Sequence, residues 1–144
     1  MRKLFLMGLL AILVTALTGC ATTATRMDQT RPVTSDRILA YQLNDESHTS
    51  TITIIRDQGF IGGGCYIYLY IDGILAGKVD VGEIASFYVT PGEHLLKVTQ
   101  DGKGLCAVNQ SWWTQRETFL KEGQHKTFRL AIGVNGKYDV MRYE

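Results

Sequence analysis

The chain carries two kinds of hydrophobic pattern, one at its start and one from residue 38 onward. Residues 4–17 form an almost continuous apolar run, whereas the later part shows short apolar or alternating runs separated by turn-forming residues. Runs of this length at intervals of roughly 8–12 residues are typical of antiparallel sandwiches and barrels. The runs are Ile38–Leu43, Ser50–Arg56, Cys65–Ile71, Leu75–Val79, Ile84–Val89, His94–Thr99, Arg116–Leu120, Lys126–Ile132 and Lys137–Arg142. Because no later stretch has a helical period, we expect an all-β fold, a small antiparallel β-sandwich.

The turns support this interpretation and define one hairpin in detail. Asp72-Gly73 and Asn135-Gly136 both tolerate the positive φ angles that a two-residue hairpin turn requires. Before the first of these turns, alternate residues face opposite sides of the sheet. The aliphatic set is Cys65, Ile67, Leu69 and Ile71, and the other set is Tyr66, Tyr68 and Tyr70. We expect the aliphatic set to enter the core, and counting back from the turn places Tyr68 opposite Gly77.

The apolar start is typical of an export signal. Arg2 and Lys3 precede the run, which at about fifteen residues is shorter than the roughly 20 residues of a membrane-spanning helix. The run ends in Leu17-Thr18-Gly19-Cys20, which resembles the lipobox of bacterial lipoproteins. The resemblance implies that residues 1–19 are a removed signal peptide and that Cys20 becomes an acylated N-terminus. A plain secretory signal and an uncleaved membrane helix are the alternatives.

The same resemblance implies a location in the bacterial cell envelope. A lipid on Cys20 anchors the protein to a membrane, and Ala21 at the next position favours the outer membrane, with the protein facing the periplasm. Residues 20–36 are polar, rich in threonine and without apolar periodicity, so we expect a flexible tether there. The β-sandwich domain is then expected over residues 37–144. An N-terminal strand or arm lying on the domain is the alternative to the tether.

Three cysteines in an exported chain leave one without a disulfide partner. If Cys20 carries the lipid, Cys65 and Cys106 remain in an oxidising compartment, and we expect them to form a disulfide. Free thiols, or a metal site that also uses His94 and His125, are the alternatives. The usual short spacing between metal ligands does not occur in the sequence, so no metal is expected.

Charge and motifs disfavour several function classes. Lys and Arg number 15 against 14 Asp and Glu, so the formal net charge of +1 indicates no nucleic-acid partner. Gly62-Gly63-Gly64 lacks the Lys-Ser/Thr that follows the glycines of a phosphate loop, and no cofactor is implied. No Gly-x-Ser-x-Gly motif or marked carboxylate pair suggests catalysis. We therefore expect a protein that is not an enzyme. The less favoured alternative is a hydrolase that gathers His94 or His125 with carboxylates in a cleft.

Aromatic residues are the candidates for a binding surface. Adjacent strand residues face opposite sides, so at most one of Trp112 and Trp113 would enter the core if they lie in a strand. The other indole would be available to a sugar ring, a peptide or the membrane interface. The alternating tyrosines Tyr66, Tyr68 and Tyr70 are the second candidate. In both cases the alternative is that the rings are covered by the protein itself.

One stretch resembles a PEGA-type module. Residues 67–73 end a strand in Asp-Gly, Ala76-Gly77-Lys78 places a glycine in the return strand, and Pro91-Gly92-Glu93-His94 turns into another strand. Similar hairpins occur in small bacterial lipoproteins. The resemblance implies an Ig- or PEGA-like sandwich and no catalytic residues. We therefore expect a non-catalytic, lipid-anchored binding or interaction module with an envelope protein or a glycan as partner. An accessory protein of an envelope machine, or an inhibitor of a wall-degrading enzyme, is the alternative.

Overall fold

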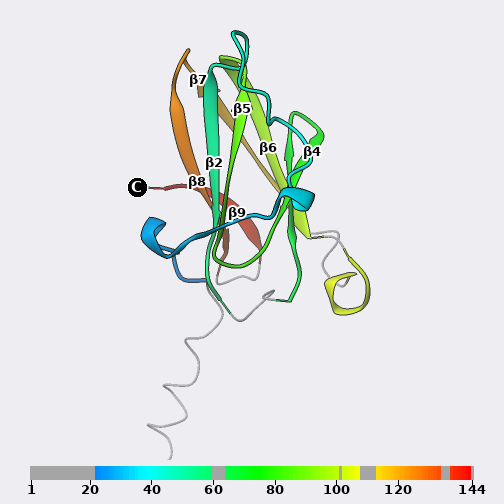
Figure 1. Cartoon of the computed structure of the whole chain (residues 1–144). Coiled ribbons are helices and arrows are strands. Elements are labelled where there is room, and N and C mark those ends of the chain that lie inside the picture. The colour runs from blue at the N-terminus through cyan, green and yellow to red at the C-terminus, as the bar shows by residue number, and fades with distance from the viewer. Residues whose placement is uncertain (1–21, 60–63, 101, 108–112, 134–136, 144) are drawn as a thin grey trace, which may run out of the picture.

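The computed structural model describes residues 22–59, 64–100, 102–107, 113–133 and 137–143, which form two β-sheets packed face to face (Figure 1). One sheet has the strand order β1-β5-β2-β8-β9 and the other β4-β3-β6-β7. The strands are β1 (Arg31–Pro32), β2 (Ser50–Arg56), β3 (Ile67–Ile71), β4 (Ile74–Val79), β5 (Glu83–Val89), β6 (Gly92–Gln100), β7 (Trp113–Leu120), β8 (His125–Ile132) and β9 (Tyr138–Arg142). Short 3-10 turns are η1 (Met27–Gln29), η2 (Ser35–Arg37) and η3 (Gly104–Ala107). The expected all-β sandwich is confirmed.

The core lies between the sheets and is built from alternate strand residues. Ile67, Leu69 and Ile71 of β3 are at most 1% exposed, as the hairpin pattern predicts. They join Phe87 of β5 and Phe128 of β8 in one hydrophobic cluster. Full burial of such side chains contributes roughly 1.5–3 kcal/mol each, so this layer is the main source of the stability of the fold. Neighbouring strands are antiparallel except for the parallel pairs β1–β5 and β2–β8.

The Asp72-Gly73 hairpin forms as predicted, but its register differs farther from the turn. The two turn residues have φ angles of +52° and +81°. A bulge in the β3–β4 pairing then shifts the register by one residue, so Tyr68 lies opposite Lys78 and not opposite Gly77. A Cβ at Gly77 would come within 3.3 Å of the ring of Phe87. The glycine is therefore needed for close packing against the core, and not as the bare backbone beneath Tyr68.

One predicted strand is wrong. Residues 38–43 make a single β-bridge, from Ile38 to Gly77, and then cross from the four-stranded to the five-stranded sheet. There the backbone N–H of Tyr88 in β5 donates to the carbonyl of Tyr41. Tyr41 has a φ of +61°, in the left-handed region that extended strands do not use. Ile38 and Tyr41 of this segment therefore pack against the core, and the segment does not extend either sheet.

Residues 22–41, here called the arm, lie along the domain, which corrects the expected flexible tether over residues 20–36. The N–H of Thr22 donates to the carbonyl of Ile132, and Thr23 bridges to Gln58. Farther along, β1 pairs with β5 at the edge of the five-stranded sheet. Figure 1 shows the arm crossing the lower end of this sheet. The folded unit therefore includes residues well before position 37, because the polar threonines satisfy backbone groups at the end of the sheet.

Candidate functional site

The outer face of the four-stranded sheet gathers the predicted tyrosines with Trp113. The strand register places Tyr68 of β3 beside Lys78 of β4 and Thr99 of β6. Thr99 in turn lies beside Trp113 of β7, so all four strands contribute to one row. We call this surface the aromatic–lysine face, and its members are Tyr66, Tyr68, Tyr70, Lys78, Lys97 and Trp113.

Lysine ammonium groups lie over the rings of this face. The Nζ atom of Lys78 is 5.1 Å from the ring centroid of Tyr68. The Nζ atom of Lys97 is 5.8 Å from the centroid of Tyr70 and 5.4 Å from that of Trp113. At these distances the ring quadrupole attracts the cation, by about 0.5–1 kcal/mol where solvent has access. The rings and cations are therefore held in a defined arrangement.

Two of the four rings of the aromatic–lysine face are open to solvent. Trp113 is 55% exposed and Tyr66 is 41% exposed, while Tyr68 and Tyr70 are half-buried. Trp112, the other predicted tryptophan, lies outside the described residues. Large exposed aromatic side chains that lie on one sheet face are a common property of binding surfaces.

The charge on this side of the sheet changes along the strands. Lys78 and Lys97 lie at the end occupied by the rings. Glu117 of β7 lies opposite Leu95 of β6, and Glu93 lies one pair farther from the lysines on the same face. Both glutamates are exposed. An anionic ligand is therefore attracted to the aromatic end and repelled from the other end.

Arg37 links the arm to the aromatic–lysine face. Its guanidinium donates to both carboxylate oxygens of Glu83, each at 2.6 Å, while its Cζ atom is 4.8 Å from the ring centroid of Tyr66. Burial of Glu83 opposes its ionisation, but hydrogen bonds from Arg37 and from the backbone N–H of Asp80 outweigh this, and the pKa of Glu83 is lowered. The buried pair fixes the position of the arm beside Tyr66.

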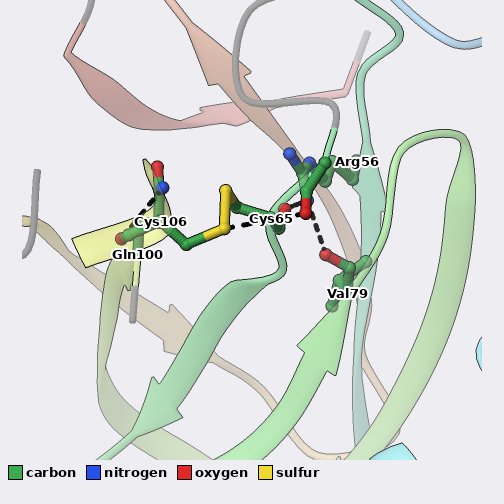
Figure 2. Close-up of a disulfide and its surroundings, with 6 residues drawn as sticks. Arg56, Cys65, Val79, Gln100 and Cys106 are labelled. Carbon is green, nitrogen blue, oxygen red and sulfur yellow. Dashed lines mark hydrogen bonds between the residues drawn. A yellow bond between two sulfur atoms is a disulfide. The ribbon is translucent and has the colours of Figure 1, made fainter. Parts of the chain in front are cut away.

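The predicted disulfide between Cys65 and Cys106 is present and joins the start of β3 to η3 (Figure 2). The two Cα atoms are 5.5 Å apart. The side-chain amide of Gln100 donates to the carbonyl of Cys106 at 3.1 Å. At Gly102, φ is +156° and a Cβ would lie 2.7 Å from that of Cys106, so this position requires glycine. The bond fixes the chain immediately before Tyr66.

Arg56 connects the two sheets beside the disulfide. It ends β2, is 2% exposed, and its Nη1 donates to the carbonyls of Cys65 at 2.6 Å and Val79 at 2.8 Å (Figure 2). Burial lowers the pKa of Arg56, and the negative charge of Asp80 opposes that shift. A buried guanidinium that satisfies backbone carbonyls of the opposite sheet has a structural role, because it keeps polar groups at this end paired.

The structure does not gather His94 and His125 with carboxylates in one open cleft. His94 does contact Asp72, with Nδ1 2.6 Å from Oδ2, but it is only 6% exposed. Its Nε2 is 2.7 Å from the carbonyl of Thr90, so neither nitrogen is available as a base. His125 lies on the other sheet, with Nε2 2.7 Å from the hydroxyl of Thr53. No group of three or more metal-ligating side chains occurs among the described residues.

Sequence reasoning found the rings of this site but missed its cations. Lys78 and Lys97 were identifiable only after the bulge and the strand order were known, since these decide which face they share with the tyrosines. Arg37 directly follows the segment expected to be a tether, and no local pattern marks it. Arg56 ends an apolar run, where a charged residue is usually solvated.

Comparisons with protein-family models, curated proteins and solved structures find no match to this chain. The fold and the candidate site therefore depend on the residues and geometry described above. In the part of the chain that the structure describes, no helix combines the length and apolar character needed to cross a membrane.

Proposed function

We propose that the protein is a non-catalytic binding module of the bacterial cell envelope, anchored by a lipid on Cys20, and that the aromatic–lysine face contacts its ligand. The observation that carries this proposal is a row of exposed and half-buried rings with lysine ammonium groups 5–6 Å away. The lipobox resemblance at residues 17–20 supports the anchor and the location facing the periplasm.

The chemistry of the face favours an acidic glycan as the ligand. The face of an aromatic ring packs against the apolar C–H side of a sugar ring. Lys78 and Lys97 add ammonium groups that bind carboxylate or phosphate groups on the same polymer. A neutral glycan would use only the rings. The alternation of rings and cations therefore matches a chain of negatively charged sugars.

Glycan binding can be tested on the lipidated chain purified in a nonionic detergent. Oligomers of galacturonic acid serve as the acidic probe and maltotriose as the neutral one. We expect the acidic oligomer to bind more tightly, and Trp113→Ala or Lys97→Gln to weaken its binding about tenfold by calorimetry, as the loss of one charged or aromatic contact predicts. Phe119→Ala is the matched control, because Phe119 is also exposed and lies on β7 at the acidic end.

Three results would contradict the proposed binding surface. The first is equal affinity for the two oligomers, and the second is an equal loss of affinity in the Phe119→Ala control. The third is crosslinking of the face in cells to one stoichiometric protein, which would favour the role of an assembly or accessory protein.

The anchor has a separate test. Mass analysis of the membrane-bound protein should find acyl chains on Cys20 and no residues 1–19. Cys20→Ala should leave an unprocessed precursor or release unlipidated protein. A membrane-bound mature form in that variant would contradict the lipid anchor and would leave the glycan test unaffected.

A further inference from the structure

The two edges of the four-stranded sheet are treated differently by the fold. At β4 the arm supplies backbone partners, because the N–H groups of Leu39 and Ala40 both donate to the carbonyl of Ala76. At β7, among the described residues, the backbone pairs with β6 alone. A strand with one unpaired edge presents a row of N–H and C=O groups to which another extended chain can bond. β7 is therefore an edge at which the sandwich can take a further strand.

The hydrogen-bonding pattern shows which backbone groups of β7 point away from the sheet. The N–H of Asp72 donates to the carbonyl of Leu95, so the odd-numbered residues of β6 bond toward β3. The even-numbered residues of β6 then bond to β7, and the register pairs them with even-numbered residues of that strand. The outward N–H and C=O groups of β7 therefore belong to odd-numbered residues, which include Gln115, Glu117 and Phe119.

Lys126 of β8 occupies one end of this edge. Its Nζ atom is 2.5 Å from the carbonyl oxygen of Phe119 and 3.4 Å from the hydroxyl of Thr118. The first contact agrees with the assignment of the Phe119 carbonyl to the outward groups. A lysine at an open edge discourages pairing with unselected strands, because each new strand must accommodate its charge. An added strand that carries a carboxylate here would offer Lys126 a new partner while its own N–H bonds to the carbonyl of Phe119.

Positive charge predominates on the core-side row of this edge. Arg116 of β7 lies opposite the core residue Leu96, so it shares that face, and it pairs with Asp139 in a contact that is open to solvent. Lys126 lies on the core-side face of β8, and Arg142 lies diagonal to it on the same face of β9. Neither Lys126 nor Arg142 has a carboxylate partner among the described residues. Two positive charges are therefore left unbalanced on this side of the sandwich.

We propose that the edge of β7 binds an extended segment of a partner protein in which acidic side chains occupy alternate positions. Main-chain hydrogen bonds to the outward groups of β7 give affinity, and the side chains of one row give specificity. Acidic side chains on the core-side row meet Arg116 and Lys126. The other row lies beside Glu117 and the 54% exposed Phe119, so it favours apolar side chains. A second copy of this chain fits less well, because pairing β7 with itself adds another Arg116 to the cationic row.

The charge requirement can be tested with two short fluorescent peptides. In one, glutamate alternates with valine, and in the other, lysine alternates with valine. The lipidated chain in nonionic detergent is titrated with each peptide, and binding is followed by fluorescence anisotropy. We expect the acidic peptide to bind about tenfold more tightly, and Lys126→Gln to weaken its binding by about the same factor, as the loss of one charged contact predicts. Lys121→Gln is the matched control, because Lys121 is exposed in the turn before β8 and loses the same charge.

The main-chain contact can be tested with two variants at one position. Glu117→Pro removes an N–H that points away from β6, so the sheet keeps its own hydrogen bonds while the peptide loses a donor. Glu117→Thr removes the same charge but keeps the N–H. We expect the acidic peptide to bind about tenfold more weakly to Glu117→Pro than to Glu117→Thr. Circular dichroism and urea denaturation show whether both variants fold.

The same hydrogen bonds can be removed from the peptide, which tests the contact even if Glu117→Pro does not fold. Only one edge of an added strand faces β7, so N-methylation of either the glutamates or the valines should abolish binding, and methylation of the other set should not. Equal effects of the two methylation patterns would overturn the proposal. Equal affinity for the acidic and the lysine peptide, or equal losses in Lys126→Gln and Lys121→Gln, would overturn it as well. A dimer of the protein alone that Glu117→Pro dissociates would assign the edge to a second copy instead.

Discussion

Two large hydrophobic side chains on the outer faces of the two sheets, Ile55 and Trp113, differ in how far the fold covers them. Ile55 points away from the core of the sandwich, because Ile54 before it enters the core, yet Ile55 is 0% exposed. On the four-stranded sheet, Trp113 is 55% exposed. The chain thus covers Ile55 with its own residues and leaves Trp113 open. The face that leaves its large aromatic side chain open is the better candidate for contact with a ligand.

The largest effect is expected at the disulfide, which fixes the open sheet next to Tyr66. Cys65 and Cys106 are 41 residues apart, so the double substitution to serine should lower the free energy of unfolding by about 4 kcal/mol in the chain-entropy model. Guanidinium denaturation of the two proteins measures the difference. A loss below about 1 kcal/mol would show that the bond adds little to this sheet.

Substitution of the covered Ile55 and of the open Trp113 should change the free energy of unfolding by very different amounts. Ile55→Ala removes a fully buried side chain and should cost about 3 kcal/mol of unfolding free energy. Trp113→Ala, although it removes a larger side chain, should change that free energy by only about 0.5 kcal/mol. Equal losses in the two variants would mean that Trp113 is covered, and the distinction between the faces would fail.

The attachment of the arm depends on a charge pair and hence on pH. Glu83→Gln removes the carboxylate that accepts two hydrogen bonds from Arg37. It should lower the free energy of unfolding by about 2 kcal/mol. Because the pKa of Glu83 is lowered in the folded state, its contribution is present above the ordinary pKa of glutamate and is lost as the pH falls through the lowered value. The free energy of unfolding, measured by denaturation at pH 7 and in mild acid, should therefore depend less on pH in Glu83→Gln than in the unsubstituted protein.

The control for this pair is Asp28→Asn. Asp28 pairs with Arg26 on the surface, where both side chains are mostly exposed, so its loss should change stability little. If Asp28→Asn lowers the free energy of unfolding as much as Glu83→Gln does, the arm is not held mainly at Arg37.

The smallest effect is expected from the lysine over the rings. Lys97→Gln should change the free energy of unfolding by only about 0.5 kcal/mol, since the contact is open to solvent. A double-mutant cycle of Lys97→Gln with Trp113→Ala measures their coupling. A coupling of zero would show that the two side chains do not hold each other in position.

The sequence was most informative where one strand has one clear face. Ile67, Leu69 and Ile71 alternate with tyrosines and enter the core, and the Asp72-Gly73 turn forms where both residues accept positive φ. The disulfide followed from the cysteine count once Cys20 was set aside. These features depend on local geometry or on simple pairing, so the residues alone could predict them.

Other features depend on contacts between residues far apart in sequence. The arm was interpreted as a tether because its threonines have no apolar period, yet Thr22 bonds to Ile132. The bulge in β3–β4 decides that Lys78 lies over Tyr68, and no local signal marks it.

The most direct test of the account is a map of where an acidic glycan binds. The lipidated chain in detergent is titrated with tri-galacturonic acid, and backbone and side-chain NMR signals are followed. The account predicts shifts at Tyr68, Tyr70, Lys97 and Trp113, with Ile55 and the rest of the outer face of the five-stranded sheet unchanged. Shifts confined to the five-stranded sheet, or none at millimolar glycan, would contradict the claim that the open aromatic–lysine face is the binding surface.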